Sequence, residues 1–116
     1  MQAIETFFSL EVSNMERATT FYVQVFDATD AYASERWSSL IVAGVRLGLA
    51  LSEEHDGEQV GLHFVVDDLE RARDEVMRAG GAAVGPRQVR PGLIHVEATD
   101  TEGNTFVLTQ ARALTG

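Results

Sequence analysis

The chain contains two copies of one short sequence segment. Residues 66–72, Val-Asp-Asp-Leu-Glu-Arg-Ala, repeat with a few substitutions the segment Val-Ser-Asn-Met-Glu-Arg-Ala at residues 12–18, which lies 54 residues earlier. In each copy the alternating pattern of a strand gives way to the pattern of an amphipathic helix. We therefore expect two similar modules, each with a strand-to-helix junction.

Both junctions carry the residues of a helix N-terminal cap. Ser13 stands three residues before Glu16, and Asp67 stands three residues before Glu70. This spacing predicts a reciprocal arrangement. The first side chain accepts a hydrogen bond from a backbone N–H of the helix, and the glutamate side chain accepts one from the backbone N–H of that first residue. We expect both helices to begin there.

The length of 116 residues suits a single domain, residues 1–116, with one hydrophobic core. No apolar run approaches the roughly 18 residues that cross a bilayer, and the N-terminus lacks an export signal. We expect a cytoplasmic protein without a membrane partner. Because the chain has no cysteine, it can form no disulfide, and any metal would depend on histidine and carboxylate ligands.

The net charge of -9 argues against nucleic acid as a partner, because such a surface repels phosphates. Solubility explains this charge more simply than attraction of a cationic ligand does.

Periodicity divides the chain into two modules and a linker. Module one, about residues 3–52, and module two, about residues 59–110, flank the polar stretch 53–58, and residues 111–116 read as a loose tail. The expected elements of module one are a strand over 4–12, a helix over 14–26 and strands over 31–34, 36–42 and 45–52. Those of module two are a strand over 61–66, a helix over 69–79 and strands over 82–84, 93–99 and 105–109.

In each strand the large apolar residues share one face, and smaller or polar residues share the other. If the helices cover the apolar faces, the opposite faces line a groove where a ligand can bind.

This organisation resembles the vicinal oxygen chelate superfamily of glyoxalases, bleomycin-resistance proteins and extradiol dioxygenases, over residues 4–110. The resemblance rests on Glu-Arg-Ala-x-x-Phe-Tyr at residues 16–22 and on the turn Asp-Thr-Glu-Gly-Asn at residues 100–104. It implies an α+β fold of two tandem βαβββ modules, whose curved mixed sheets surround a groove. It also implies a homodimer, sometimes with modules exchanged between chains.

In the enzymes of this superfamily, a divalent metal is held by His or Glu at four inward positions. These correspond here to Phe7, Gly48, Gly61 and Val107, none of which can bind a metal. We therefore expect neither a metal nor another cofactor, and the resemblance does not extend to chemistry that depends on the metal.

The residues expected to face the groove form the candidate ligand-binding set. His63, His95 and Glu97 could serve as a displaced metal site or an acid and base pair, although ligand contact is the simpler reading. Trp37 faces the groove only if Ala43-Gly44 forms a two-residue turn; otherwise it is a core or dimer-contact indole. The complete set is Phe7, Ser9, Glu11, Trp37, His63, His95, Glu97 and Val107.

Two functions follow. The chain is either a metal-independent protein that binds a small, partly aromatic molecule, such as an antibiotic, or a non-standard lyase, isomerase or cyclase that uses groove His and Glu residues. Metal chelation, and the contrast between stoichiometric binding and turnover, distinguish the two.

Overall fold

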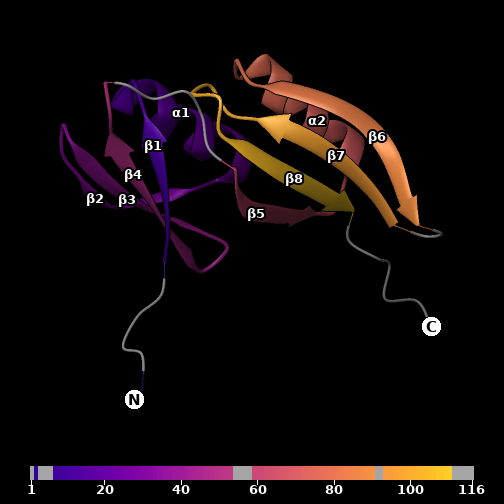
Figure 1. Ribbon diagram of the computed structural model, residues 1–116, viewed down its shortest axis with the longest axis horizontal. Helices are drawn as coiled ribbons and strands as arrows, with labels where there is room; N and C mark the ends of the chain where they lie inside the picture. The colour runs from indigo at the N-terminus through magenta and orange to yellow at the C-terminus, as the bar shows by residue number, and fades with distance from the viewer. Residues whose placement is uncertain (1, 3–6, 54–58, 91–92, 111–116) are drawn as a thin grey trace.

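The computed structural model describes residues 2, 7–53, 59–90 and 93–110, and within these ranges it confirms the two βαβββ modules (Figure 1). The expected linker residues 54–58 and the expected tail 111–116 lie outside the described residues. Module one comprises β1 (Phe8–Val12), α1 (Met15–Phe26), β2 (Thr29–Ala33), β3 (Trp37–Val42) and β4 (Val45–Leu51). Module two comprises β5 (Gln59–Val66), α2 (Leu69–Arg78), β6 (Ala82–Arg90), β7 (Leu93–Thr99) and β8 (Thr105–Gln110).

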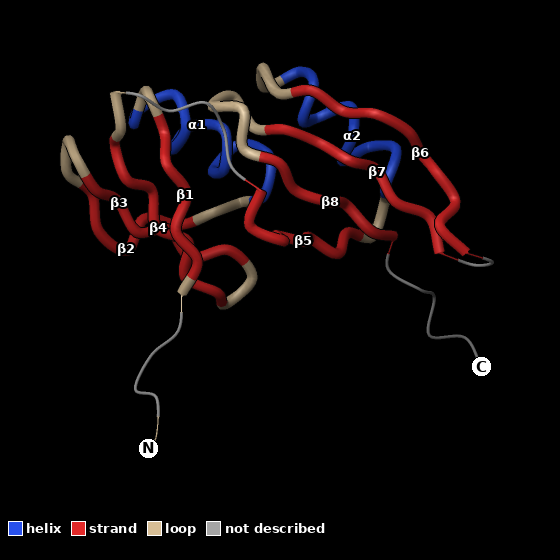
Figure 2. The backbone as a smooth tube through the Cα atoms, viewed as in Figure 1, coloured by secondary structure: helices blue, strands red, loops and turns tan. Residues whose placement is uncertain are grey.

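Each module forms its own four-stranded mixed sheet. The strand orders are β1-β4-β3-β2 and β5-β8-β7-β6, with β1–β4 and β5–β8 parallel and the other pairs antiparallel. The two sheets stay open (Figure 2). The edge strands β1 and β5 therefore have one unpaired side within the described chain.

Strand β6 is longer than expected. The sequence predicts a strand over 82–84 that ends before Pro86, whereas β6 has nine residues and continues with shifts of register against β7. Proline cannot donate to a strand ladder, but within the described residues β6 pairs with β7 alone, and an edge strand tolerates the missing donor.

The helix caps lie one residue later than predicted. The side chain of Asn14 accepts the backbone N–H of Arg17 at 3.0 Å, and that of Asp68 accepts the N–H of Arg71 at 3.1 Å. Ser13, the predicted cap, instead donates its hydroxyl to Glu102. The sequence places the junction correctly, but the competing partner of Ser13 comes from the other module.

The turn between β3 and β4 decides where Trp37 points. Ala43 and Gly44 both have positive φ angles, 49° and 82°, as a two-residue hairpin turn requires, and Leu40 pairs with Leu47. This is the register that sends Trp37 away from the helix side of the sheet.

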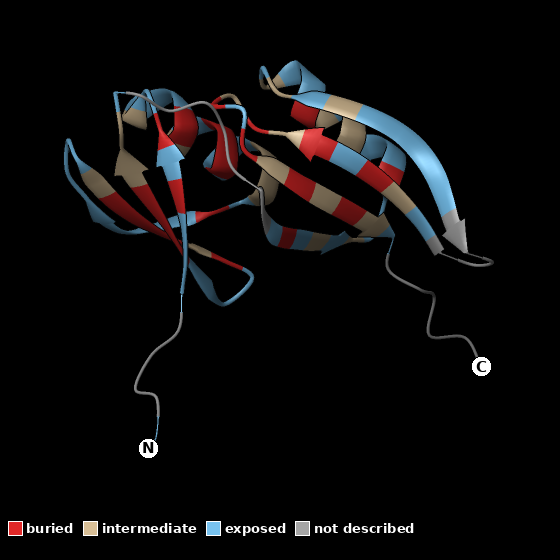
Figure 3. Cartoon of the chain, viewed as in Figure 1, coloured by how far each residue is buried: buried red, intermediate tan, exposed pale blue. Residues whose placement is uncertain are grey.

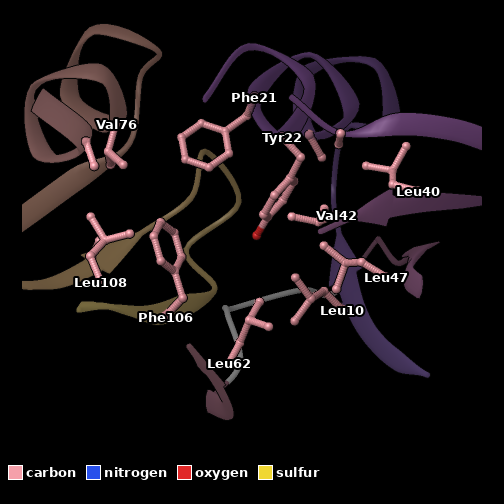
Figure 4. Close-up of a cluster of buried hydrophobic side chains, with 14 of the residues drawn as sticks. Leu10, Phe21, Tyr22, Leu40, Val42, Leu47, Leu62, Val76, Phe106 and Leu108 are labelled. Carbon is pink, nitrogen blue, oxygen red and sulfur yellow. The ribbon is translucent and has the colours of Figure 1, made fainter. Parts of the chain in front are cut away.

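One cluster of buried side chains draws on both modules. Each helix packs on the sheet of its own module, and the two helices also contact each other. Phe26 of α1 stacks on Phe64 of β5 at a ring distance of 4.0 Å. Phe21 of α1 lies 6.2 Å from Phe106 of β8, and Figure 4 shows these two rings among the buried side chains. The buried and less buried residues that alternate along the strands (Figure 3) separate a helix side from an open face, defined here as the face turned away from the helices. Within the described ranges, neither helix has the length and apolar character needed to span a bilayer.

Candidate functional site

The open face of module two contains a cavity of about 370 Å³. It lies over β5, β8, β7 and β6, and most of its wall is apolar. Glu97, Thr99 and Thr105 bring polar side chains to it, whereas Gly61, Val84 and Val107 are among its apolar lining residues. A cavity with a few polar groups on an apolar wall is the usual form of a small-molecule site.

Strand register explains how these residues meet. Val107 of β8 pairs with His63 of β5 on one side and with Glu97 of β7 on the other, and Glu97 pairs with Val84 of β6. Because directly paired residues point to the same face, this cross-strand row belongs to the open face. Of the predicted site residues, Glu97 and Val107 line the cavity.

The two predicted histidines lie close together beside that cavity. The rings of His63 and His95 are 6.3 Å apart between their centroids, at an angle of 73°. The guanidinium of Arg87 lies 3.4 Å from the carboxylate of Glu97, and both side chains are largely exposed. Within the ranges that the structure describes, no group of three His, Asp or Glu side chains could hold a metal ion.

The other predicted residues lie on the open face of module one. Phe7 precedes β1, and its ring stands nearly perpendicular to the indole of Trp37, at 79° and a centroid distance of 6.0 Å. Ser9 and Glu11 follow on β1 and pair with Gly48 and Ala50 of β4. Among the described residues, those that line the cavity all belong to module two. The Phe7–Trp37 pair and the His63–His95 pair belong to different modules, each with its own sheet.

The residues at the four metal-ligand positions do not fit a metal. Phe7 presents a phenyl ring and Val107 an isopropyl group, and neither supplies a donor atom. Gly48 lies beneath the indole of Trp37, and Gly61 adopts a φ of 68° with open space in front of it. No reaction step through a metal follows from these residues.

A buried polar network at the junction of the modules was missed by sequence reasoning. Glu102, in the turn before β8, accepts hydrogen bonds from the backbone N–H groups of Ser13 and Asn14 and from the side chains of Ser13, Arg17 and Thr101. Burial by itself would raise the pKa of Glu102, but these hydrogen bonds together outweigh it and lower the pKa to about 2. Nothing in a polar turn at residues 100–104 indicates that it packs against the first helix.

A second buried carboxylate extends this network into the core. The hydroxyl of Tyr22 donates to Asp100 at 2.7 Å, and the amide of Asn104 donates to Asp100 at 3.1 Å and to the backbone carbonyl of Glu11 at 2.9 Å. Burial, and then the charge of Asp100, raise the pKa of Tyr22 well above its ordinary value. Tyr22 is therefore a core residue, as predicted, and this network fixes β1 against the closing turn of module two.

The alternation along β7 and β8 could have revealed two further site residues. Thr99 has the same strand parity as Glu97, and Thr105 the same as Val107, and all four line the cavity. Val84 was harder to assign to a face, because residues 82–84 are all apolar and show no alternation.

Comparison with known proteins agrees with this architecture. The family model of the glyoxalase-like domain matches residues 7–109. The chain resembles the fosfomycin resistance protein FosX from Mesorhizobium loti, with 22% identity, a TM-score of 0.74 and coverage of 97% of this chain and 95% of that one. FosX from Listeria monocytogenes matches with 15% identity, a TM-score of 0.81 and coverage of 97% and 96%.

A bleomycin-binding protein from Streptomyces verticillus, in complex with copper(II)-bleomycin, has the same fold. It shares 16% identity with a TM-score of 0.71, and the match covers 97% of this chain and 99% of that one. No curated protein sequence matches the chain significantly. At these identities the structural likeness concerns the fold, whereas the family model covers most of the sequence itself. The chain thus belongs to the glyoxalase-like family of the vicinal oxygen chelate superfamily.

Proposed function

We propose that this protein binds a small molecule with both polar and apolar groups on its open face without the help of a metal. The observation that carries the proposal is the 370 Å³ cavity of module two, with Glu97, Thr99 and Thr105 as polar contacts on an apolar wall. The four metal-ligand positions support metal independence, because they offer no donor side chain. The similarity of the fold to a bleomycin-binding protein and to FosX makes an antibiotic one class of ligand to test.

A second copy of the chain would complete the site. The Phe7–Trp37 pair belongs to the other module from the cavity, and in the described part of the chain the edge strands β1 and β5 each have an unpaired side. Phe7, Val65 and Val84 are exposed to 46%, 70% and 73% respectively, which is costly for apolar side chains in water. A homodimer would cover this surface and bring the open faces of different modules together.

Calorimetric titration with bleomycin and with fosfomycin tests the proposal, in the presence and in the absence of a chelator. Binding of one ligand at a fixed stoichiometry, unaffected by the chelator and with the ligand recovered unchanged, would support it. Binding that disappears upon chelation would refute metal independence.

The second candidate function is an enzyme that uses His63 and His95. It is favoured by the 6.3 Å separation of the two rings and by Glu97, which lies two residues beyond His95 on β7. Mass spectrometry of each compound after incubation distinguishes the two functions. A new product that is lost in both His63→Gln and His95→Gln would establish the enzyme and refute simple sequestration.

A further inference from the structure

On the open face of module one, a row of small residues lies beneath the chain's only tryptophan, and we call this row the seat. Ser9 of β1 pairs with Gly48 of β4, and Gly48 pairs with Ser39 of β3, so the three lie in one row across the sheet. Trp37 occupies the same face two residues before Ser39, and its indole leans over this row toward Phe7. We call Trp37 and Phe7 the aromatic corner.

Gly48 makes room for the indole. A Cβ atom at this position would lie 2.3 Å from Cη2 and 2.7 Å from Cζ2 of Trp37, distances that real atoms do not tolerate. Gly48 is buried even though it lies on the open face, because the indole covers it. Any other residue at position 48 would push the ring off the sheet.

The backbone of Trp37 is also held. The hydroxyl of Ser34 donates to the carbonyl oxygen of Trp37 at 2.6 Å and accepts the N–H of the same residue at 3.1 Å. Trp37 is therefore held by hydrogen bonds of its backbone, by Gly48 beneath its benzene ring and by the perpendicular ring of Phe7 beside it. A ring fixed before binding loses little conformational entropy when a ligand stacks on it.

We infer that the aromatic corner takes the place of the missing metal as a recognition element, and that it is a stacking subsite for a flat aromatic ring of the ligand. Two of the four metal-ligand positions, Phe7 and Gly48, form its wall and its seat. Aromatic rings attract one another through offset or edge contacts, and an indole offers the largest such surface of any side chain. The inference rests on the proposed function and specifies one part of the ligand.

The first test follows the indole itself, since Trp37 provides all the tryptophan fluorescence of the protein. Gly48→Ala should expose the ring, shift its emission to longer wavelength and raise its quenching by acrylamide about two-fold. The clash is with the tip of a side chain, which can rotate, so the backbone fold should survive. Ala31→Val, which adds methyl groups at an exposed position of β2, is the matched control and should leave the emission unchanged. Unchanged emission in Gly48→Ala would contradict the claim that Gly48 makes room for the indole of Trp37.

The second test uses proflavine, a flat aromatic cation, followed by its fluorescence anisotropy at about 0.15 M salt, where distant charges are screened. Gly48→Ala and Trp37→Leu should each weaken binding about ten-fold, as expected for the loss of one stacking contact. Neither change alters the net charge, so general attraction to an acidic protein is equal in all variants. The double variant should bind as weakly as Trp37→Leu alone, because the glycine acts only through the indole.

The outcomes separate this inference from the proposed function. Equal binding of proflavine by the natural protein and by both single variants would refute the stacking subsite but leave small-molecule binding intact. Failure of the natural protein to bind proflavine would also refute it, while the calorimetric titrations judge the proposed function independently. If Gly48→Ala does not fold, Trp37→Leu, which leaves the seat empty, still decides the question.

Discussion

The carboxylate of Glu102 accepts a hydrogen bond from the guanidinium Nε–H of Arg17 at 2.6 Å, although the two residues lie 85 positions apart in the sequence. The carboxylate side chain is fully buried, whereas that of Arg17 is half exposed. Glu102 also accepts hydrogen bonds from the backbone N–H groups of Ser13 and Asn14, just before the first helix. One side chain of module two thus binds the strand-to-helix junction of module one. This contact ties together two modules that form separate four-stranded sheets in the described chain.

Glu102→Gln should destabilise the protein at neutral pH and remove part of its sensitivity to acid. Glu102 has a folded pKa of about 2 against an ordinary value of 4.5, so its carboxylate stabilises the fold above pH 4.5. That contribution, of order 3 kcal/mol, is lost as the pH falls from 4.5 to about 2. Urea unfolding between pH 2 and pH 7 should show a flatter profile for the variant.

Glu75→Gln is the matched control for this prediction. Glu75 also pairs with an arginine, Arg71 at 3.3 Å, but that arginine is largely exposed. Its loss should change the unfolding free energy by less than about 1 kcal/mol. Equal effects of the two substitutions would show that burial of Glu102 adds nothing to its contact with Arg17.

Local pattern predicted the modules and the strand parity, because each depends on neighbouring residues, whereas the sequence left open which way Trp37 faces. The Ala43-Gly44 turn fixes the pairing of Leu40 with Leu47 by its length alone. Both helix caps were predicted one residue too early, at Ser13 and Asp67, whereas Asn14 and Asp68 accept the capping N–H. At the first helix a distant residue takes part, because Glu102 accepts the hydroxyl of Ser13. The cavity was anticipated only in part: Glu97 and Val107 belong to the predicted set, whereas Val84, although it lies in the predicted strand over 82–84, was not assigned to the groove.

The purified protein should contain no stoichiometric divalent metal. The four positions that could supply ligands in this fold hold Phe7, Gly48, Gly61 and Val107. Elemental analysis after dialysis checks this prediction. About one zinc, nickel or iron per chain would contradict it, and loss of that metal in His63→Ala or His95→Ala would identify the two histidines as its ligands.

The protein should be a homodimer at micromolar concentration. In the described chain β1 and β5 each have an unpaired side, and Phe7 and Val65 are exposed. A dimer would remove these groups from water. Light scattering measures the mass directly, against 12.7 kDa for one chain. A monomer at this concentration would mean that each chain binds its ligand on one sheet alone.

His63→Leu and Phe64→Ala should have opposite effects, although they are adjacent on β5. His63 is exposed on the open face, so its replacement should change the unfolding free energy by less than about 0.5 kcal/mol and reduce ligand binding. Phe64 stacks on Phe26 at 4.0 Å and lies 5.4 Å from Phe106, so its truncation leaves a cavity that costs about 3 kcal/mol. Thermal melts of the two variants compare them without knowledge of the ligand. Because strand neighbours face opposite sides, an earlier melt for His63→Leu than for Phe64→Ala would mean that the ligand-facing and core-facing sides of β5 are exchanged.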